Sequence, residues 1–263
     1  MSEFTDRKIT VQTAEMEKIV VSHETYNSSL GEQKPIDIYT SPDYLEEAKP
    51  AVLFVTGYSD TGFEKIFGCK QKDMGSYTSW ARLLASNGIA CITYENAEPE
   101  KDVSAVLDHL ITNSKSIGID ATRIAIWACS GNVPNAINLA KERGTLLASA
   151  IFCYGYTVDL GADTYVQDAA DEFKFMSPIR NISREDKILG LPFLVVRAGQ
   201  DRMPNLNKSM DLFIEYSLHQ NLGMEVINYP GGVHAFDLED DTKAGQRVIH
   251  QVVDYTKSHL EIA

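Results

Sequence analysis

From residue 51 onward, the chain alternates between short apolar runs and longer segments with apolar residues at helical spacing. Residues 51–55 have no polar interruption, which is typical of a parallel strand buried on both faces of a sheet. Residues 74–87 place apolar side chains every three or four positions, which predicts an amphipathic helix. The same reasoning predicts further strands at 89–94, 123–127, 148–154, 193–196 and 224–229, and further helices at 102–115, 134–143, 206–221 and 242–260. Strands that alternate with helices predict an α/β fold with a mostly parallel, doubly wound sheet.

The first 50 residues follow a different pattern. Residues 9–12, 18–23 and 36–39 alternate apolar and polar positions, and a Ser-Ser-Leu-Gly turn separates the last two segments. This predicts antiparallel strands that lead into the sheet. Since no repeat or linker is evident, we expect one domain over residues 1–263, with N-terminal strands in residues 1–49.

The alternation is interrupted between residues 155 and 190. This stretch is acidic and contains Pro178. An insertion between core units predicts a short, partly helical cap or lid over a site, with a long surface loop as the alternative. A cap of this length favours a small pocket over a long acyl tunnel.

A strand, a tight turn and a helix follow one another around Ser130. The strand at residues 123–127 leads into the small residues Ala128-Cys-Ser-Gly, and apolar positions from Val133 onward have helical spacing. A serine at the apex of such a turn matches the nucleophile elbow, which exposes the serine oxygen at the positive end of the helix. A structural turn with an incidental serine is the alternative.

Residues typical of a catalytic triad follow three of the predicted strands. Ser130, Asp201 and His234 each come after a strand, and ligands of such sheets bind beyond the strands' carboxyl ends. Their order along the chain is the one expected for this architecture. Serine needs an adjacent base, an imidazole titrates near neutrality, and a carboxylate can fix its tautomer. We expect the oxyanion hole to use the backbone N–H groups of Gly131 and Tyr58.

Three motifs carry a resemblance to a known superfamily. Ile126-Trp-Ala-Cys-Ser-Gly-Asn, Ala198-Gly-Gln-Asp and Val233-His-Ala-Phe-Asp together resemble the α/β-hydrolases, over roughly residues 50 to 260. Within them, the chain is most similar to dienelactone hydrolase-like and related esterase proteins, mainly through His-Ala-Phe-Asp. The resemblance implies an α/β-hydrolase fold and a serine hydrolase that cleaves a carboxylic ester or related acyl bond of a small molecule through an acyl-enzyme.

The elbow departs from the usual pattern at two positions. Asn132 is bulkier than the glycine usually found there, and Cys129 precedes the serine. Dienelactone hydrolases use a cysteine nucleophile, so Cys129 is an alternative. We expect Ser130, because only that register leaves Gly131 directly after the nucleophile. A receptor for small molecules on the same fold is a second alternative, and thioester cleavage, acyl transfer and C–C hydrolysis would use the same triad.

Two further carboxylates lie near these motifs. Glu95 follows the predicted strand at 89–94, and we interpret it as an exposed loop residue. Asp237 comes three residues after His234 and could cap the last helix or support the histidine; we favour the cap.

Charge and cysteine usage limit the possible partners and compartment. The net charge of −13 argues against nucleic acid and anionic membranes, which bind basic patches. The four cysteines form no CxxC pair, so we expect reduced thiols, no metal site and no cofactor. Residues 1–8 are polar, and no apolar run approaches ~18 residues, so we expect neither a signal peptide nor a spanning helix. A cytoplasmic protein is the resulting interpretation.

Overall fold

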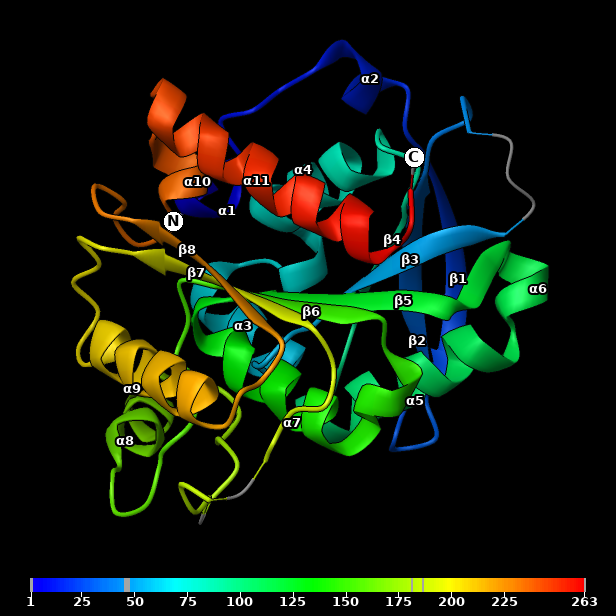
Figure 1. Cartoon of the computed structure of the whole chain (residues 1–263). Helices are drawn as coiled ribbons and strands as arrows, with labels where there is room; N and C mark the ends of the chain where they lie inside the picture. Colours follow the sequence, from blue (N-terminus) through cyan, green and yellow to red (C-terminus); the bar gives the residue numbers. More distant parts are fainter. Residues whose placement is uncertain (1, 45–47, 181, 186, 263) are drawn as a thin grey trace.

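Eight strands form a single sheet through the centre of the molecule (Figure 1). The computed structural model describes residues 2–44, 48–180, 182–185 and 187–262. The strands lie in the order β1-β2-β4-β3-β5-β6-β7-β8. They are β1 (Val20–Asn27), β2 (Gln33–Thr40), β3 (Lys49–Phe54), β4 (Ala90–Tyr94), β5 (Ile119–Cys129), β6 (Ser149–Cys153), β7 (Phe193–Ala198) and β8 (Met224–Tyr229). β2 runs antiparallel to β1 and β4, and all other pairs are parallel, which confirms the predicted sheet.

Helices cover both faces of the sheet because its central strands are apolar on both sides. In β3, Val52 and Phe54 enter one core, whereas Ala51 and Leu53 enter the other. Figure 1 shows α4 (Gly75–Ala85) and α11 (Lys243–His259) on the first face, and α5 (Pro99–Thr112), α7 (Val133–Arg143) and α9 (Leu206–His219) on the second. The remaining α-helices of the described residues are α1 (Ser2–Thr5), α2 (Ala14–Glu17), α3 (Asp60–Phe67), α6 (Ser114–Ile117), α8 (Tyr165–Phe173) and α10 (Phe236–Glu239). Three short 3₁₀ helices in the same part of the chain are η1 (Gln71–Asp73), η2 (Ser130–Asn132) and η3 (Gly144–Leu146). None of the helices in the described residues is long and apolar enough to cross a membrane.

A cluster of aromatic side chains supports the strand that leads to the elbow. The ring of Trp127 on β5 packs against Phe54 at 5.0 Å, Trp80 at 5.6 Å and Tyr77 at 6.0 Å between centroids. Aromatic pairs at these separations contribute about 0.5–1.5 kcal/mol each beyond the area they bury. These aromatic contacts therefore stabilise the position of the carboxyl end of β5.

The prediction of a strand at residues 9–12 is wrong. These residues have no regular structure, although Ile9 and Val11 are buried. The Ile9 N–H donates to Ser79 Oγ at 3.0 Å, and the Thr10 N–H donates to the Asp237 carbonyl at 2.8 Å. The alternation here reflects a segment that packs on the helices of one face, because its backbone has found partners outside the sheet.

One helix near the site was not predicted. Ser59 accepts a hydrogen bond from the Gly62 N–H and so begins α3, and Gly68, with φ of 81°, ends it. The helix directly follows the loop after β3. It therefore brings Phe63 and Phe67 to the carboxyl edge of the sheet.

The segment between residues 155 and 190 contains α8 and otherwise irregular backbone. Asp159 accepts hydrogen bonds from the N–H groups of Val166 (2.9 Å) and Gln167 (2.8 Å) in the first turn of α8. Carboxylates are favoured at that end of a helix. Lys174, in the left-handed conformation, ends the helix and turns Phe175 toward the carboxyl edge of the sheet.

Candidate active site

Ser130 stands at a strained turn between β5 and α7. Its backbone φ of 55° lies in the left-handed region, which residues other than glycine rarely adopt. The turn has no room for larger neighbours, because a methyl group on Gly57 would come within 2.7 Å of the Gly131 carbonyl oxygen. Ser130 therefore presents its hydroxyl beyond the strand end, as an elbow requires.

The structure brings Ser130, His234 and Asp201 into one line of hydrogen bonds. The Ser130 hydroxyl lies 2.9 Å from Nε2 of His234, and Nδ1 of His234 lies 2.6 Å from Oδ2 of Asp201. The Asp201 side chain is inaccessible to solvent, whereas that of His234 is 28% exposed. A buried carboxylate at Nδ1 favours the tautomer that leaves Nε2 free to accept the serine proton.

The loops that carry Asp201 and His234 hold each other in place. The Gln200 N–H donates to the carbonyl of Gly232 at 2.7 Å, and the Gly199 N–H donates to that of Tyr229 at 2.8 Å. These bonds continue the pairing of β7 with β8 beyond the strand ends. The separation of the carboxylate and the imidazole is thus fixed by backbone contacts.

Asn132 ties the loop after β3 to the elbow. Its Oδ1 accepts from the Gly57 N–H at 2.7 Å and from Nε2 of Gln71 at 3.1 Å, and its Nδ2 donates to the Tyr77 hydroxyl at 2.8 Å. The next N–H along, that of Tyr58, has no acceptor among the described residues. The amide side chain that makes Asn132 unusual in an elbow therefore positions, through its hydrogen bonds, the loop predicted to contribute to the oxyanion hole.

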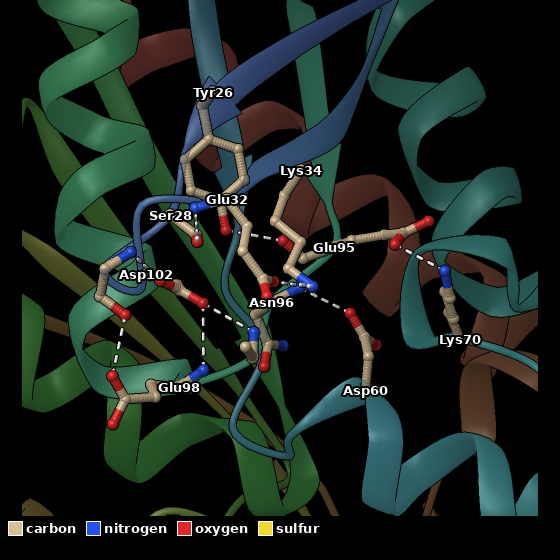
Figure 2. A network of polar contacts seen from close by, with 12 residues as sticks. Tyr26, Ser28, Glu32, Lys34, Asp60, Lys70, Glu95, Asn96, Glu98 and Asp102 are labelled. Carbon is tan, nitrogen blue, oxygen red and sulfur yellow. Dashed lines mark hydrogen bonds and ion pairs between the residues drawn. The ribbon is translucent and has the colours of Figure 1, made fainter.

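A second amide, that of Asn96, also holds this loop. Nδ2 of Asn96 donates to the Tyr58 carbonyl at 3.0 Å and to Thr56 Oγ1 at 2.9 Å. The Asn96 N–H in turn donates to the buried Asp60 at 2.6 Å, and Figure 2 shows these two residues side by side. The Gln71 N–H donates to the same carboxylate at 3.3 Å. Burial raises the pKa of the Asp60 carboxyl to about 6 despite these two hydrogen bonds.

Glu95 belongs to the same cluster and is not the exposed loop residue that we expected. Its side chain is 14% exposed and forms an ion pair with Lys70 at 2.5 Å (Figure 2). Its backbone carbonyl also accepts from the Tyr26 hydroxyl at 2.7 Å. Neither Glu95 nor Lys70 lines the cavity at Ser130, so this pair joins the segment after α3 to the end of β4 and does not touch the site.

A cavity of about 640 Å³ opens above the serine. Ser130 and His234 form part of its wall, and α3 and the segment between residues 155 and 190 form much of the rest. Glu172 and Lys174 are the charged lining residues, besides the histidine, in the described part of the chain. Apolar side chains dominate the wall, among them Phe63, Phe67, Phe173, Phe175, Met203 and Leu238.

Solved esterases share this architecture. An ester hydrolase from the metagenome of Lake Arreo aligns with 95% of this chain and 85% of its own, at 16% identity and a TM-score of 0.72. The chain has the α/β-hydrolase fold. An esterase from the archaeon Pyrobaculum calidifontis aligns over 100% of this chain and 90% of its own (16% identity, TM-score 0.69). A bacterial heroin esterase aligns over 95% and 87% (14% identity, TM-score 0.68).

The sequence itself matches no family model and no curated protein. The evidence for the α/β-hydrolase fold is thus structural, and the narrower resemblance to dienelactone hydrolases stays a prediction. Among the residues described, no three His, Cys, Asp or Glu side chains are arranged to hold a metal ion.

Cys129 is less suited than Ser130 to act as the nucleophile of this site. Burial raises the pKa of its thiol to about 12, and the nearby Asp237 carboxylate adds to the rise. The thiolate is the reactive form of cysteine, so this environment suppresses its reactivity. Nε2 of His234 is bonded to Ser130 and not to Cys129.

Asp237 does not cap the last helix, as we had favoured, because Thr242 occupies that position in α11. Its buried carboxylate accepts from Nε1 of Trp80 at 2.6 Å and from the Tyr154 hydroxyl at 2.8 Å. Burial raises its pKa. The Tyr154 ring packs edge-on against the imidazole of His234 at 5.4 Å, so Asp237 supports the histidine through Tyr154.

Proposed function

We propose that this protein is a serine hydrolase that cleaves a carboxylic ester, or a related acyl bond, of a small molecule. The observation that carries the proposal is the line from Ser130 through His234 to Asp201 at the wall of an apolar cavity. The likeness to solved esterases supports the same activity.

Ser130, His234 and Asp201 each have a role in the proposed cleavage of the ester. Ser130 Oγ attacks the carbonyl carbon while Nε2 of His234 takes the hydroxyl proton. Asp201 accepts the Nδ1–H bond and stabilises the imidazolium that forms. When the tetrahedral intermediate collapses, the imidazolium protonates the departing alcohol and leaves an acyl-enzyme. Water, activated by the same histidine, then attacks the acyl carbon and releases the acid and the free serine.

The negative charge of the tetrahedral intermediate needs hydrogen-bond donors. We assign this task to the N–H groups of Gly131 and Tyr58. Gly131 lies in the first turn after the nucleophile, where N–H groups lack partners within the helix. The Tyr58 N–H has no acceptor among the described residues, and the bonds of Asn132 to Gly57 and of Asn96 to the Tyr58 carbonyl hold it in place. Such preorganised donors act on charge as it develops in the transition state.

The cavity favours an uncharged substrate with an apolar group of modest size. Its walls are mainly aromatic and aliphatic, and one basic side chain, Lys174, is accompanied by the acidic Glu172. A carboxylate buried among such walls without a partner would carry a large desolvation cost. We propose that residues 155–190 act as the cap of this pocket, since Phe173 and Phe175 reach its wall.

A screen of p-nitrophenyl esters with acyl chains from two to twelve carbons tests the proposal. We expect turnover that rises with chain length and then falls once the acyl group outgrows the cavity, and no turnover with Ser130→Ala. A wild-type protein that hydrolyses none of these esters would contradict the proposed activity and favour the alternative of a small-molecule receptor.

A further inference from the structure

The side chain of Tyr58 reaches across the elbow and brings its hydroxyl to Gly131. A methyl group added to Gly131 would collide with the hydroxyl oxygen of Tyr58, which therefore lies directly over the residue after the nucleophile. The ring packs against Phe63 at 5.7 Å and Phe175 at 6.0 Å between centroids, both edge to face. These contacts fix the direction of the hydroxyl, and Tyr58 lines the cavity together with Ser130.

The Tyr58 hydroxyl differs from its neighbours because it has no protein partner among the described residues. Tyr154 donates to Asp237 at 2.8 Å, and Tyr156 donates to the Pro204 carbonyl at 2.8 Å. Tyr58 is half-buried and lines the cavity, so its hydroxyl is available to a group bound there. Burial also raises the pKa of Tyr58, so its hydroxyl keeps its proton and stays a donor at any working pH.

We propose that the Tyr58 hydroxyl is a donor of the oxyanion hole, in addition to the backbone N–H groups of Tyr58 and Gly131. The inference rests on the proposed hydrolase function. The oxyanion must lie within hydrogen-bond reach of the Gly131 N–H, and the phenol oxygen lies over the same residue. A neutral donor in an apolar cavity meets the developing charge without a change of protonation.

The composition of the cavity supports a chemical role for the hydroxyl over a packing role. Phenylalanines occupy neighbouring positions of the same wall, at residues 63, 67, 173 and 175. If position 58 needed only an aromatic ring, phenylalanine would supply it and would leave no polar atom without a partner. The hydroxyl is therefore the feature of Tyr58 that packing does not explain.

The test is Tyr58→Phe, which removes the oxygen and keeps the ring. We expect kcat to fall about 10²–10³-fold, the loss typical of one oxyanion-hole donor, while KM changes little. The affinity for an alkyl boronic acid, which forms a tetrahedral adduct on the serine, falls by a similar factor. The matched control is Tyr255→Phe, because the Tyr255 hydroxyl on α11 also lacks a partner in the described part of the chain, and Tyr255 does not line the cavity. We expect this control to keep wild-type kinetics.

Three results would overturn the inference. One is a kcat for Tyr58→Phe that equals the wild-type value within the error set by the control. Another is a rise in KM with kcat unchanged, which would mean that the hydroxyl binds ground state and transition state equally. The third is unchanged boronate affinity. Activity lost in Ser130→Ala but kept in Tyr58→Phe would remove the Tyr58 role alone, whereas an inactive wild type would remove the proposed function as well.

Discussion

Two of the loops that build the candidate site, those after β3 and β5, follow adjacent strands but are held in different ways. The loop after β5 is shaped locally, since a strand, a left-handed Ser130 and a helix follow one another without interruption. The loop after β3 is held by side chains that are distant in sequence, Asn132 and Asn96. The two strands pair in parallel, so both loops emerge at the same edge.

The elbow therefore supplies a group that reacts, whereas the contacts of the β3 loop position the groups that stabilise the reaction. Changes at the elbow and its partners remove the groups that react. Changes around the β3 loop leave those groups in place and alter the position of the oxyanion donors. We therefore expect large, non-additive losses of kcat on one side and smaller, graded losses on the other.

The largest expected effect is that of Ser130→Ala. Loss of the nucleophile should lower kcat on an activated ester by about 10⁶-fold, as for the serine of subtilisin. Cys129→Ala is the matched control, since it removes the neighbouring nucleophile and should keep most of the activity. The opposite outcome, activity kept without Ser130 and lost without Cys129, would establish the thiol mechanism instead.

Asp201→Asn should lower kcat by up to about 10⁴-fold with little change in KM, because an amide favours the wrong imidazole tautomer. His234→Ala should cause comparable damage. A double variant should be little worse than either single one, since triad members act as a unit. The measurement is a double-mutant cycle on kcat, and full additivity of the two losses would mean that the residues do not work together.

Asn132 lies in the elbow but holds the β3 loop, so Asn132→Ala should cost less. It releases the Gly57 N–H and with it the position of the Tyr58 N–H, so we expect kcat to fall about 10–10²-fold. Asn87→Ala is the control, because among the described residues the Asn87 amide bonds only to Leu83 and Ser86 at the end of α4, away from the β3 loop. If Asn132→Ala lost activity as fully as Ser130→Ala, the division between chemistry and geometry would be wrong.

Asp60 should affect stability more than turnover. Its pKa is raised from 3.8 to about 6 by burial, so between these values the unfolded chain has released a proton that the folded chain keeps. The free energy of unfolding therefore loses up to about 3 kcal/mol through this group as pH rises from 4 to 7. Lys70 opposes the shift and Glu95 adds to it.

Urea unfolding of wild type and Asp60→Asn at pH 4.5 and 7.5 measures this contribution. The variant lacks the titrating group, so its stability relative to wild type should improve at the higher pH. A relative stability that is the same at both pH values would show that the Asp60 carboxyl titrates in its ordinary range.

Much of the fold follows from local patterns in the sequence. The buried strands after residue 50 could be predicted because each is a short apolar run, as in residues 51–55. The irregular structure of residues 9–12 could not be predicted. Their apolar and polar positions alternate as in a strand, and only the structure shows that the segment packs on helices and bonds to Ser79. The helix α3 was not predicted because it has only eight residues, contains Gly62, and offers few apolar positions to show a helical repeat.

The residues of the candidate site likewise fall into those that the sequence predicts and those that only the structure shows. Ser130, Asp201 and His234 could be chosen because each follows a strand, and parallel strands end at one edge. The role of Asn132 could be suspected only from its misfit with the elbow pattern. Nothing local indicates Asn96, because its partners in the β3 loop lie about forty positions earlier in the chain.

The most direct test of the account is to trap the acyl-enzyme and locate it. Wild-type protein mixed with an activated ester and quenched in acid within milliseconds should gain the mass of one acyl group, and peptide mapping should place that group on Ser130. His234→Ala, mixed in the same way, should gain none on this time scale. An acyl group on Cys129, or turnover with no adduct on Ser130, would contradict the central claim that Ser130 is the nucleophile.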